Sequence, residues 1–171
     1  IEAFNILDTA YHIPHTQLVF AGKKGWLYED MFRKAKETGV GSRVVFTDYV
    51  SEEDKYPLIA GAKCFVLPSL YEGFGIPVLE AMALGVPVAI SNVSSLPEVG
   101  GQAAFYFNPE KPESIAETLA GVLKLSPEEK EMTIRAGKIQ AKKFTWEKCA
   151  EKILDTLERL VISNLPAGRQ V

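Results

Sequence analysis

Short apolar runs alternate with longer amphipathic stretches along most of the chain. The runs are continuous rather than alternately apolar and polar, which is typical of parallel strands covered on both faces. They are Leu18–Ala21, Val44–Thr47, Cys64–Leu67, Pro87–Ser91 and Ala103–Phe107. Each run predicts a strand, and strands alternating with helices predict right-handed βαβ units in one open sheet of about five strands.

The stretches between the runs have the apolar spacing of helices. We expect these helices at about Glu2–His12, Leu27–Gly39, Ser51–Gly61 and Pro77–Gly85. Ser51 precedes three acids that suit a helix N-terminus, and Gly39 and Gly85 lie where C-terminal caps belong.

After the last run the pattern changes to three successive helices, expected at Pro112–Leu123, Pro127–Phe144 and Thr145–Ser163. The predicted fold class is therefore α/β, a Rossmann-like, doubly wound, mostly parallel sheet with extra C-terminal helices. Residues 1–163 form one domain in this prediction, and 164–171 form a flexible tail. The chain opens in a helical pattern, whereas a doubly wound unit begins with a central strand, so we expect that strand upstream of Ile1 or an unusual sheet.

Size and composition limit the classes of function. The 171 residues suffice for one domain, and 47% hydrophobic with 24% charged residues is a soluble, globular profile. A net charge of −3 argues against nucleic-acid binding. The absence of a basic leader and of a long apolar run predicts a cytoplasmic protein. Cys64 and Cys149 are expected to be reduced, mostly buried thiols rather than a disulfide or redox site.

The segment PSLYEGFGIPVLEAMALGVP, residues 68–87, carries the candidate chemistry. It predicts a strand end, a short loop and a helix that starts near Pro77, which suits a first-turn position because it lacks an N–H group. Gly73 and Gly75 allow a sharp turn and the close approach of a ligand. The loop therefore directs free N–H groups and a helix dipole at the carboxyl edge of the sheet, where a diphosphate is favoured.

Glu72 and Glu80 flank this turn. A carboxylate near a helix N-terminus stays ionised and offers acceptor oxygens to paired hydroxyls, such as those of a ribose or a hexose. A solvated or purely dipole-complementing role is the alternative for either acid. Because both acids flank one phosphate-competent turn, the binding interpretation is favoured.

The segment EGFGIPVLE resembles the E-x7-E signature of the GT-B glycosyltransferases of family 4, also called glycosyl transferases group 1. The segments LVFAGKKGW, VVFTDYVSEED, ALGVPVAISNVSSLPEVGG and AAFYFNP also follow the family's order and spacing. The resemblance covers about residues 1–124 and corresponds to the C-terminal, donor-binding domain.

The resemblance implies a role for each signature residue. Glu80 matches the glutamate that holds the ribose hydroxyls, and Glu72 matches the one beside the donor sugar, which we take as the catalytic residue. Gly73, Phe74, Gly75 and Ile76 match the turn whose N–H groups meet the distal phosphate and the sugar.

Two further segments resemble parts of the nucleotide site. Gly22 and Lys23 match the loop that borders the nucleotide, and Tyr49 and Val50 match the position that lies against the base. The family implies transfer of a hexose from a nucleotide-diphosphate sugar to a hydroxyl acceptor, with retained configuration, typically no bound metal and no cofactor beyond the donor.

The sequence departs from the family in what would precede Ile1. The Arg-Lys segment that clamps the diphosphate and the N-terminal acceptor-binding domain are absent from the 171 residues. We therefore expect the isolated chain to be inactive and weakly binding. An apolar gap or an exposed strand edge is also expected, which self-association could cover.

Several alternatives stay open. The chain could be a stand-alone, non-catalytic nucleotide-sugar binding module or a fragment of a GT-B sugar-nucleotide epimerase. An NAD site is disfavoured because Val78 stands where the last glycine of the fingerprint belongs.

Other features of the sequence favour ordinary structural roles. His12 and His15 suggest a surface loop rather than a metal pair, and the two tryptophans, Trp26 and Trp146, suggest packing anchors. A lysine stretch at 138–143 favours a solvated face, with peripheral membrane contact as the second interpretation.

Overall fold

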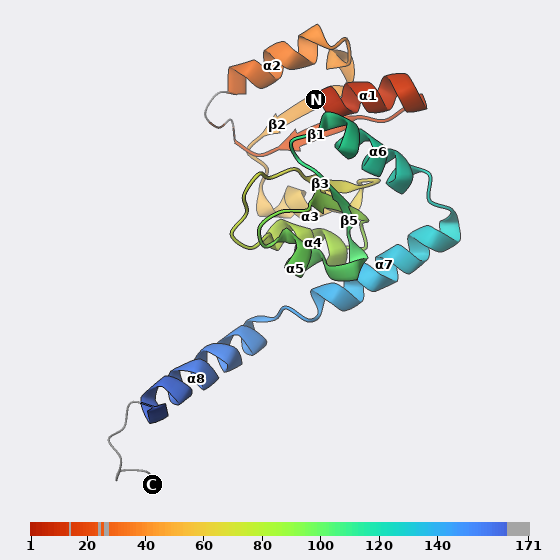
Figure 1. Ribbon diagram of the computed structural model, residues 1–171. Coiled ribbons are helices and arrows are strands. Elements are labelled where there is room, and N and C mark those ends of the chain that lie inside the picture. The colour runs from red at the N-terminus through yellow and green to blue at the C-terminus, as the bar shows by residue number, and fades with distance from the viewer. Residues whose placement is uncertain (14, 24, 26–27, 164–171) are drawn as a thin grey trace.

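The computed structural model describes residues 1–13, 15–23, 25 and 28–163. In chain order the elements are α1 (Glu2–Tyr11), β1 (Leu18–Ala21), α2 (Tyr28–Glu37), η1 (Gly41–Arg43), β2 (Val44–Asp48), α3 (Glu52–Ala60), β3 (Phe65–Leu67), α4 (Ile76–Ala83), β4 (Val88–Ser91), α5 (Leu96–Gly100), η2 (Gly101–Ala103), β5 (Phe105–Phe107), α6 (Pro112–Leu123), α7 (Pro127–Ala141) and α8 (Trp146–Ser163). All the strands and long helices expected from the sequence are present (Figure 1). The short helices α5, η1 and η2 were not predicted, because three to five residues are too few to show a helical period. The expected tail at 164–171 lies outside the described residues.

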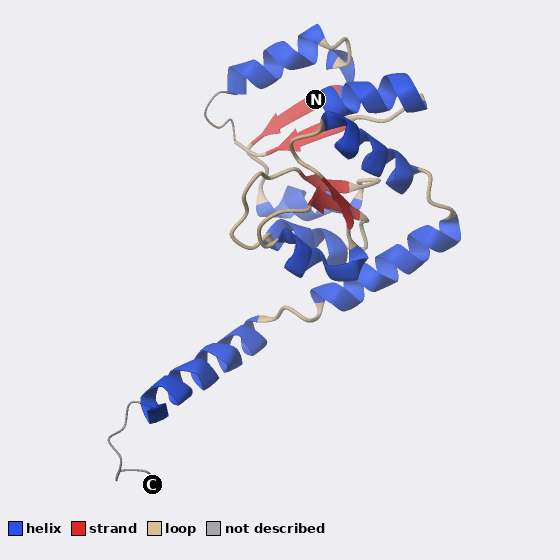
Figure 2. Ribbon diagram, viewed as in Figure 1, coloured by secondary structure: helices blue, strands red, loops and turns tan. Residues whose placement is uncertain are grey.

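The strands form two parallel sheets rather than the single sheet expected. One has the order β1-β2 and the other the order β3-β4-β5, as the two groups of arrows in Figure 2 show. The α/β class and the parallel pairing are confirmed, with Leu18 opposite Val44 and Phe65 opposite Val88. Among the described strands, β1, β2, β3 and β5 each have one edge without a hydrogen-bonded neighbour.

The two sheets also differ in how they are covered. All four residues of β4 are fully buried, because α4 and α5 pack on one face of its sheet and α6 packs on the other. On β1 and β2 one face packs against helices, but Val19 and Val45 on the other face are 39% and 36% exposed. The expectation that every strand is covered on both faces is therefore wrong for the smaller sheet.

Local capping signals set several element ends. Ser51 is the N-cap of α3, and its Oγ accepts a hydrogen bond from the backbone N–H of Asp54 at 3.1 Å. Gly39 and Gly85 have φ angles of 75° and 78°, the left-handed conformation that suits a glycine after a helix. Both expectations from the sequence are confirmed.

The last helix extends away from the body of the molecule (Figure 1). Trp146 at its start is 80% exposed, so the expectation that it anchors packing is wrong; Trp26 lies outside the described residues. Cys149 on the same helix is exposed, which corrects the expectation of two mostly buried thiols, although both cysteines are free. In the part of the chain that the structure describes, no helix is both long and apolar enough to cross a bilayer.

Candidate functional site

The turn between β3 and α4 has the geometry that the glycine pattern predicts, but only one glycine is required by its conformation. Gly75 has a φ of 100°, and a Cβ atom there would lie 2.9 Å from Leu96 Cδ2. A Cβ on Gly73 would meet nothing within 4 Å. Gly75 therefore makes the turn, and Gly73 leaves open space beside the backbone.

Two serines after β4 hold this turn in place. Ser94 Oγ and Ser95 Oγ donate hydrogen bonds to the carbonyl oxygen of Glu72 at 2.6 and 2.8 Å, and Ser95 Oγ also lies 3.2 Å from the carbonyl oxygen of Phe74. In a trans peptide the next N–H group points opposite to the carbonyl. The N–H groups of Gly73 and Gly75 are therefore directed away from the serines.

Sequence reasoning missed these serines. The signal available for them is their position, because Ser94 and Ser95 follow β4 closely and β4 is the parallel neighbour of β3. Loops at the same edge of adjacent parallel strands lie side by side, so hydroxyls after β4 can reach the turn after β3.

The two signature glutamates are both half-buried and differ in their partners. Glu72 lies on the loop outside α4, as expected, and its Oε2 accepts a hydrogen bond from Ser69 Oγ at 3.2 Å. Glu80 lies within α4, and its Oε1 is 3.0 Å from Lys55 Nζ on α3. Pro77 occupies the first turn of α4 and leaves no N–H group to satisfy.

The loops after β1 and β2 meet each other. Gly22, with a φ of 135°, donates its N–H to the carbonyl oxygen of Asp48 at 3.0 Å. Lys23 Nζ lies 5.3 Å from the centroid of the Tyr49 ring, which is 65% exposed. This contact places a cation and an exposed aromatic face together at the carboxyl edge of the smaller sheet.

Helix α3 connects the two groups of candidate residues. Val50 precedes the N-cap Ser51, and Lys55 in the next turn reaches Glu80 on α4. The structure thus brings Gly22, Lys23, Tyr49 and Val50 to one edge, and links them through α3 to the signature segment. All the candidate residues follow the carboxyl ends of parallel strands, where ligands of open α/β sheets bind.

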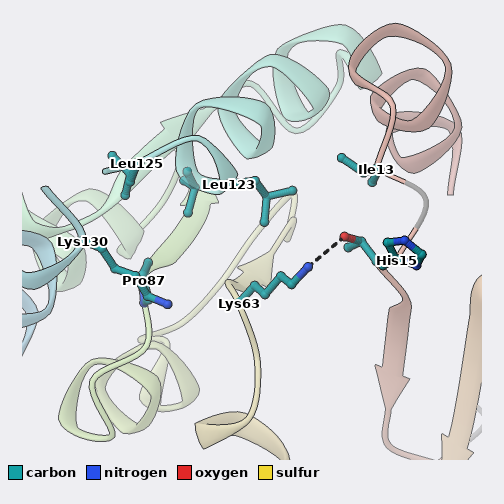
Figure 3. Close-up of a pocket in the computed structure, with 9 residues that line it drawn as sticks. Ile13, His15, Lys63, Pro87, Leu123, Leu125 and Lys130 are labelled. Carbon is teal, nitrogen blue, oxygen red and sulfur yellow. Dashed lines mark hydrogen bonds between the residues drawn. The ribbon is translucent and has the colours of Figure 1, made fainter. Parts of the chain in front are cut away.

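A pocket of about 420 Å³ lies at the opposite edge of the sheets (Figure 3). Its lining includes Thr16, Lys63 and Pro87, each of which lies one or two residues before a strand. Lys63 Nζ lies 3.3 Å from Thr16 Oγ1 and so bridges the segments before β3 and β1. This pocket is therefore separate from the candidate site.

The weaker candidates have ordinary surroundings. His12 ends α1 with a φ of 51°, and both His12 and His15 are exposed. Among the described residues, no group of three or more His, Cys, Asp or Glu side chains could hold a metal ion. In the lysine stretch, Lys143 follows the end of α7, and its Nζ lies 2.8 Å from Oε1 of Gln140 in that helix.

Several proteins with known names are similar in sequence to this chain. The O-antigen chain mannosyltransferase B of Escherichia coli is 36% identical over 165 residues, which is 94% of this chain and 42% of that protein. A mannosyltransferase of Mycolicibacterium hassiacum, the MMP alpha-(1->4)-mannosyltransferase, is 29% identical over 73% of this chain and 31% of its own length.

Solved structures share the fold. Sucrose-phosphate synthase from Thermosynechococcus elongatus superposes with a TM-score of 0.78 at 23% identity, over 95% of this chain and 43% of that one. HepE of Anabaena, solved with UDP, has a TM-score of 0.76 at 19% identity, over 91% and 44%.

The chain spans less than half the length of these relatives. Residues 1–140 match the family described as glycosyl transferases group 1, and this match includes both signature glutamates and the turn between them. The chain therefore belongs to the glycosyl transferases group 1, the GT-B glycosyltransferase family that its E-x7-E segment resembles.

Proposed function

We propose that this chain is the donor-binding part of a retaining glycosyltransferase that moves a hexose from a nucleotide-diphosphate sugar to a hydroxyl acceptor. The observation that carries the proposal is the turn at 72–76, where Ser94 and Ser95 bind the carbonyl oxygen of Glu72 and Ser95 also contacts that of Phe74. This arrangement presents successive backbone donors at the start of a helix, with one carboxylate on each side.

In this proposal each part of the turn meets one part of the donor. Glu80 accepts hydrogen bonds from the ribose diol, and Glu72 accepts them from the hydroxyls of the sugar. The N–H groups of Gly73 and Gly75 bind the distal phosphate, where negative charge develops as the sugar leaves. Tyr49 and Val50 lie against the base.

Mannose is the sugar that the relatives favour. The proteins of Escherichia coli and Mycolicibacterium hassiacum are named mannosyltransferases, and a relative from Mycobacterium tuberculosis is named as GDP-mannose-dependent. HepE, which is more distant, was solved with UDP-glucose. We therefore propose a mannosyl donor for this chain, with GDP as the carrier.

Transfer requires more than the described residues supply. Donor and acceptor must be held together with water excluded, which in the GT-B architecture implies a second domain closing over the crevice. In a doubly wound sheet the first strand of the unit lies in the centre. If β1 and β2 lie on one side of this central position and β3, β4 and β5 on the other, the unpaired edges of β1 and β3 face each other across it. We propose that a parallel strand from a longer polypeptide lies there.

The binding proposal is tested by measuring the Tm of the 171-residue chain with GDP-mannose, UDP-glucose or ADP-glucose added. A ligand at 100 times its Kd stabilises a protein by about 2.7 kcal/mol. For a domain of this size that is a rise in Tm of roughly 5–10 °C. We expect the largest rise with GDP-mannose; no rise with any nucleotide sugar would overturn the proposal. NMR of the anomeric proton in the product of the intact protein tests retention.

A further inference from the structure

Lys55 lies near the start of α3 in a position that the helix cap fixes. Ser51 Oγ accepts the N–H of Asp54 at 3.1 Å, and the N–H of Lys55 donates to the carbonyl oxygen of Ser51 at 2.9 Å. The first turn of α3 is therefore closed by hydrogen bonds. From this turn the side chain of Lys55 extends to α4 and contacts Glu80, a residue 25 positions later in the sequence.

The ammonium group of Lys55 has two acidic neighbours and one aromatic neighbour. Its Nζ atom lies 3.0 Å from Glu80 Oε1, 3.1 Å from Glu52 Oε2 and 4.6 Å from the centroid of the Tyr56 ring. The side chains of Lys55 and Glu80 are 29% and 21% exposed, whereas that of Glu52 is 76% exposed. Because water screens exposed pairs most strongly, Glu80 is the main partner.

The two oxygens of the Glu80 carboxylate therefore have different surroundings. Oε1 is occupied by Lys55, whereas Oε2 accepts no hydrogen bond from any residue that the structure describes. A glutamate without such a partner loses rotamer freedom when it binds a ligand, and a side chain that is already ordered avoids that cost.

We infer that Lys55 is a positioning residue that holds Glu80 Oε1, so that the carboxylate is ordered with Oε2 free to accept a ribose hydroxyl of the donor. The inference rests on the proposed function, because it assigns to Lys55 the orientation of a ribose-binding group. Lys55 itself does not touch the donor in this arrangement.

An ion pair at the other edge of the sheets provides a matched control. Arg43, which directly precedes β2, pairs with Asp8 on α1, and their side chains are 21% and 26% exposed. This pair has similar burial and also joins two elements, but it lies away from the signature turn. Arg43 also donates a hydrogen bond to the carbonyl oxygen of Ile13 at 3.0 Å, so its loss reports the effect of removing a well-bonded, half-buried cation away from the candidate site.

The experiment measures the dissociation constants of GDP, 2′-deoxy-GDP and 3′-deoxy-GDP for the intact protein by calorimetry. UDP and its deoxy analogues replace them if UDP binds more tightly. The variants are Lys55→Met, Lys55→Arg, Glu80→Gln and Arg43→Met. The quantity compared is the ratio of the dissociation constants of the deoxy and ribose nucleotides, with Tm as the measure of folding.

We expect Glu80→Gln to lower the ratio, because the amide oxygen accepts a hydrogen bond more weakly than the carboxylate, and Arg43→Met to leave the ratio unchanged. Lys55→Met should lower the ratio roughly 3- to 10-fold, the size expected when one side chain must be ordered during binding, and Lys55→Arg should restore most of it. If Lys55→Met gives the same ratio of dissociation constants as Arg43→Met while Glu80→Gln still lowers that ratio, the inference about Lys55 is overturned. The proposed function is not affected by that result. Absence of binding of either nucleotide to the unchanged protein would overturn both.

Discussion

Ser95 Oγ donates a 2.8 Å hydrogen bond to the carbonyl oxygen of Glu72, so the turn after β4 fixes the orientation of the loop after β3. The two residues are 23 positions apart in the sequence, and no local pattern connects them. The bond orients the peptide between Glu72 and Gly73, and with it the N–H group that we assign to phosphate binding.

Ser95→Ala should therefore weaken binding of the nucleotide sugar more than it destabilises the fold. Loss of one hydrogen bond costs about 1 kcal/mol of folding free energy, measured by urea unfolding. Ser114→Ala is the matched control, because Ser114 Oγ also makes one hydrogen bond to a loop backbone, accepting the N–H of Asn108 at 3.1 Å. Equal affinity of Ser95→Ala and Ser114→Ala for the nucleotide sugar would contradict this role of Ser95.

The two glycines of the turn should respond differently to alanine. Gly75→Ala places a side chain at a φ of 100° and 2.9 Å from Leu96 Cδ2, so we expect a loss of stability of about 1–3 kcal/mol. Gly73→Ala meets no atom within 4 Å and should keep its Tm, but should bind the donor less tightly if the phosphate approaches there. Thermal unfolding with and without donor measures both effects. Normal donor binding by Gly73→Ala would place the phosphate elsewhere.

Substitution of the two signature glutamates should affect different steps, nucleotide binding for Glu80 and sugar transfer for Glu72. Glu80→Ala should lose about 1.5–3 kcal/mol of nucleotide binding, roughly 10- to 150-fold in Kd, with the fold retained. Glu72→Gln should leave the Kd of the free nucleotide unchanged and reduce transfer by the intact protein, because Glu72 is assigned to the sugar. Calorimetry and a transfer assay measure the two effects. Unchanged nucleotide affinity in Glu80→Ala would remove that residue from the ribose role.

The two thiols should differ in reactivity. Burial raises the pKa of the Cys64 thiol to about 12, whereas Cys149 is exposed. Iodoacetamide at pH 8–9 should therefore label Cys149 and spare Cys64 in the folded protein, since the thiolate is the reactive form. The raised pKa also means that the contribution of Cys64 to stability is complete below about pH 9 and is lost as the pH rises toward 12. Mass spectrometry of Cys149→Ser should show no label; rapid labelling of this variant would contradict the raised pKa of the half-buried Cys64 thiol.

The isolated 171 residues should show no transfer, even with labelled GDP-mannose and sugar or lipid acceptors. Under the proposed function, transfer needs a second domain that closes over the donor and excludes water. The intact protein, assayed beside it at equal concentration, should transfer. Robust transfer with retained configuration by the isolated chain would show that a second domain is not required.

Local sequence determined the elements, their ends and the candidate turn. The apolar runs placed every strand to within two residues, and Ser51, Gly39 and Gly85 marked helix ends, because capping and periodicity depend on neighbours within one or two turns. The strand end at Leu67 and the helix start near Pro77 also put Glu72 on a loop and Glu80 on a helix, as the structure has them.

Only the tertiary structure decided which of these local pieces touch. The division into two sheets, the exposed face of Val19 and Val45, and the exposed Trp146 all depend on which surfaces meet, and one sequence pattern is compatible with several such arrangements. The same holds for the contacts between Ser95 and Glu72 and between Lys55 and Glu80, which join loops and helices more than 20 residues apart. Their geometry follows from the pairing of β3 with β4 and the packing around α4, which no periodicity within the sequence specifies.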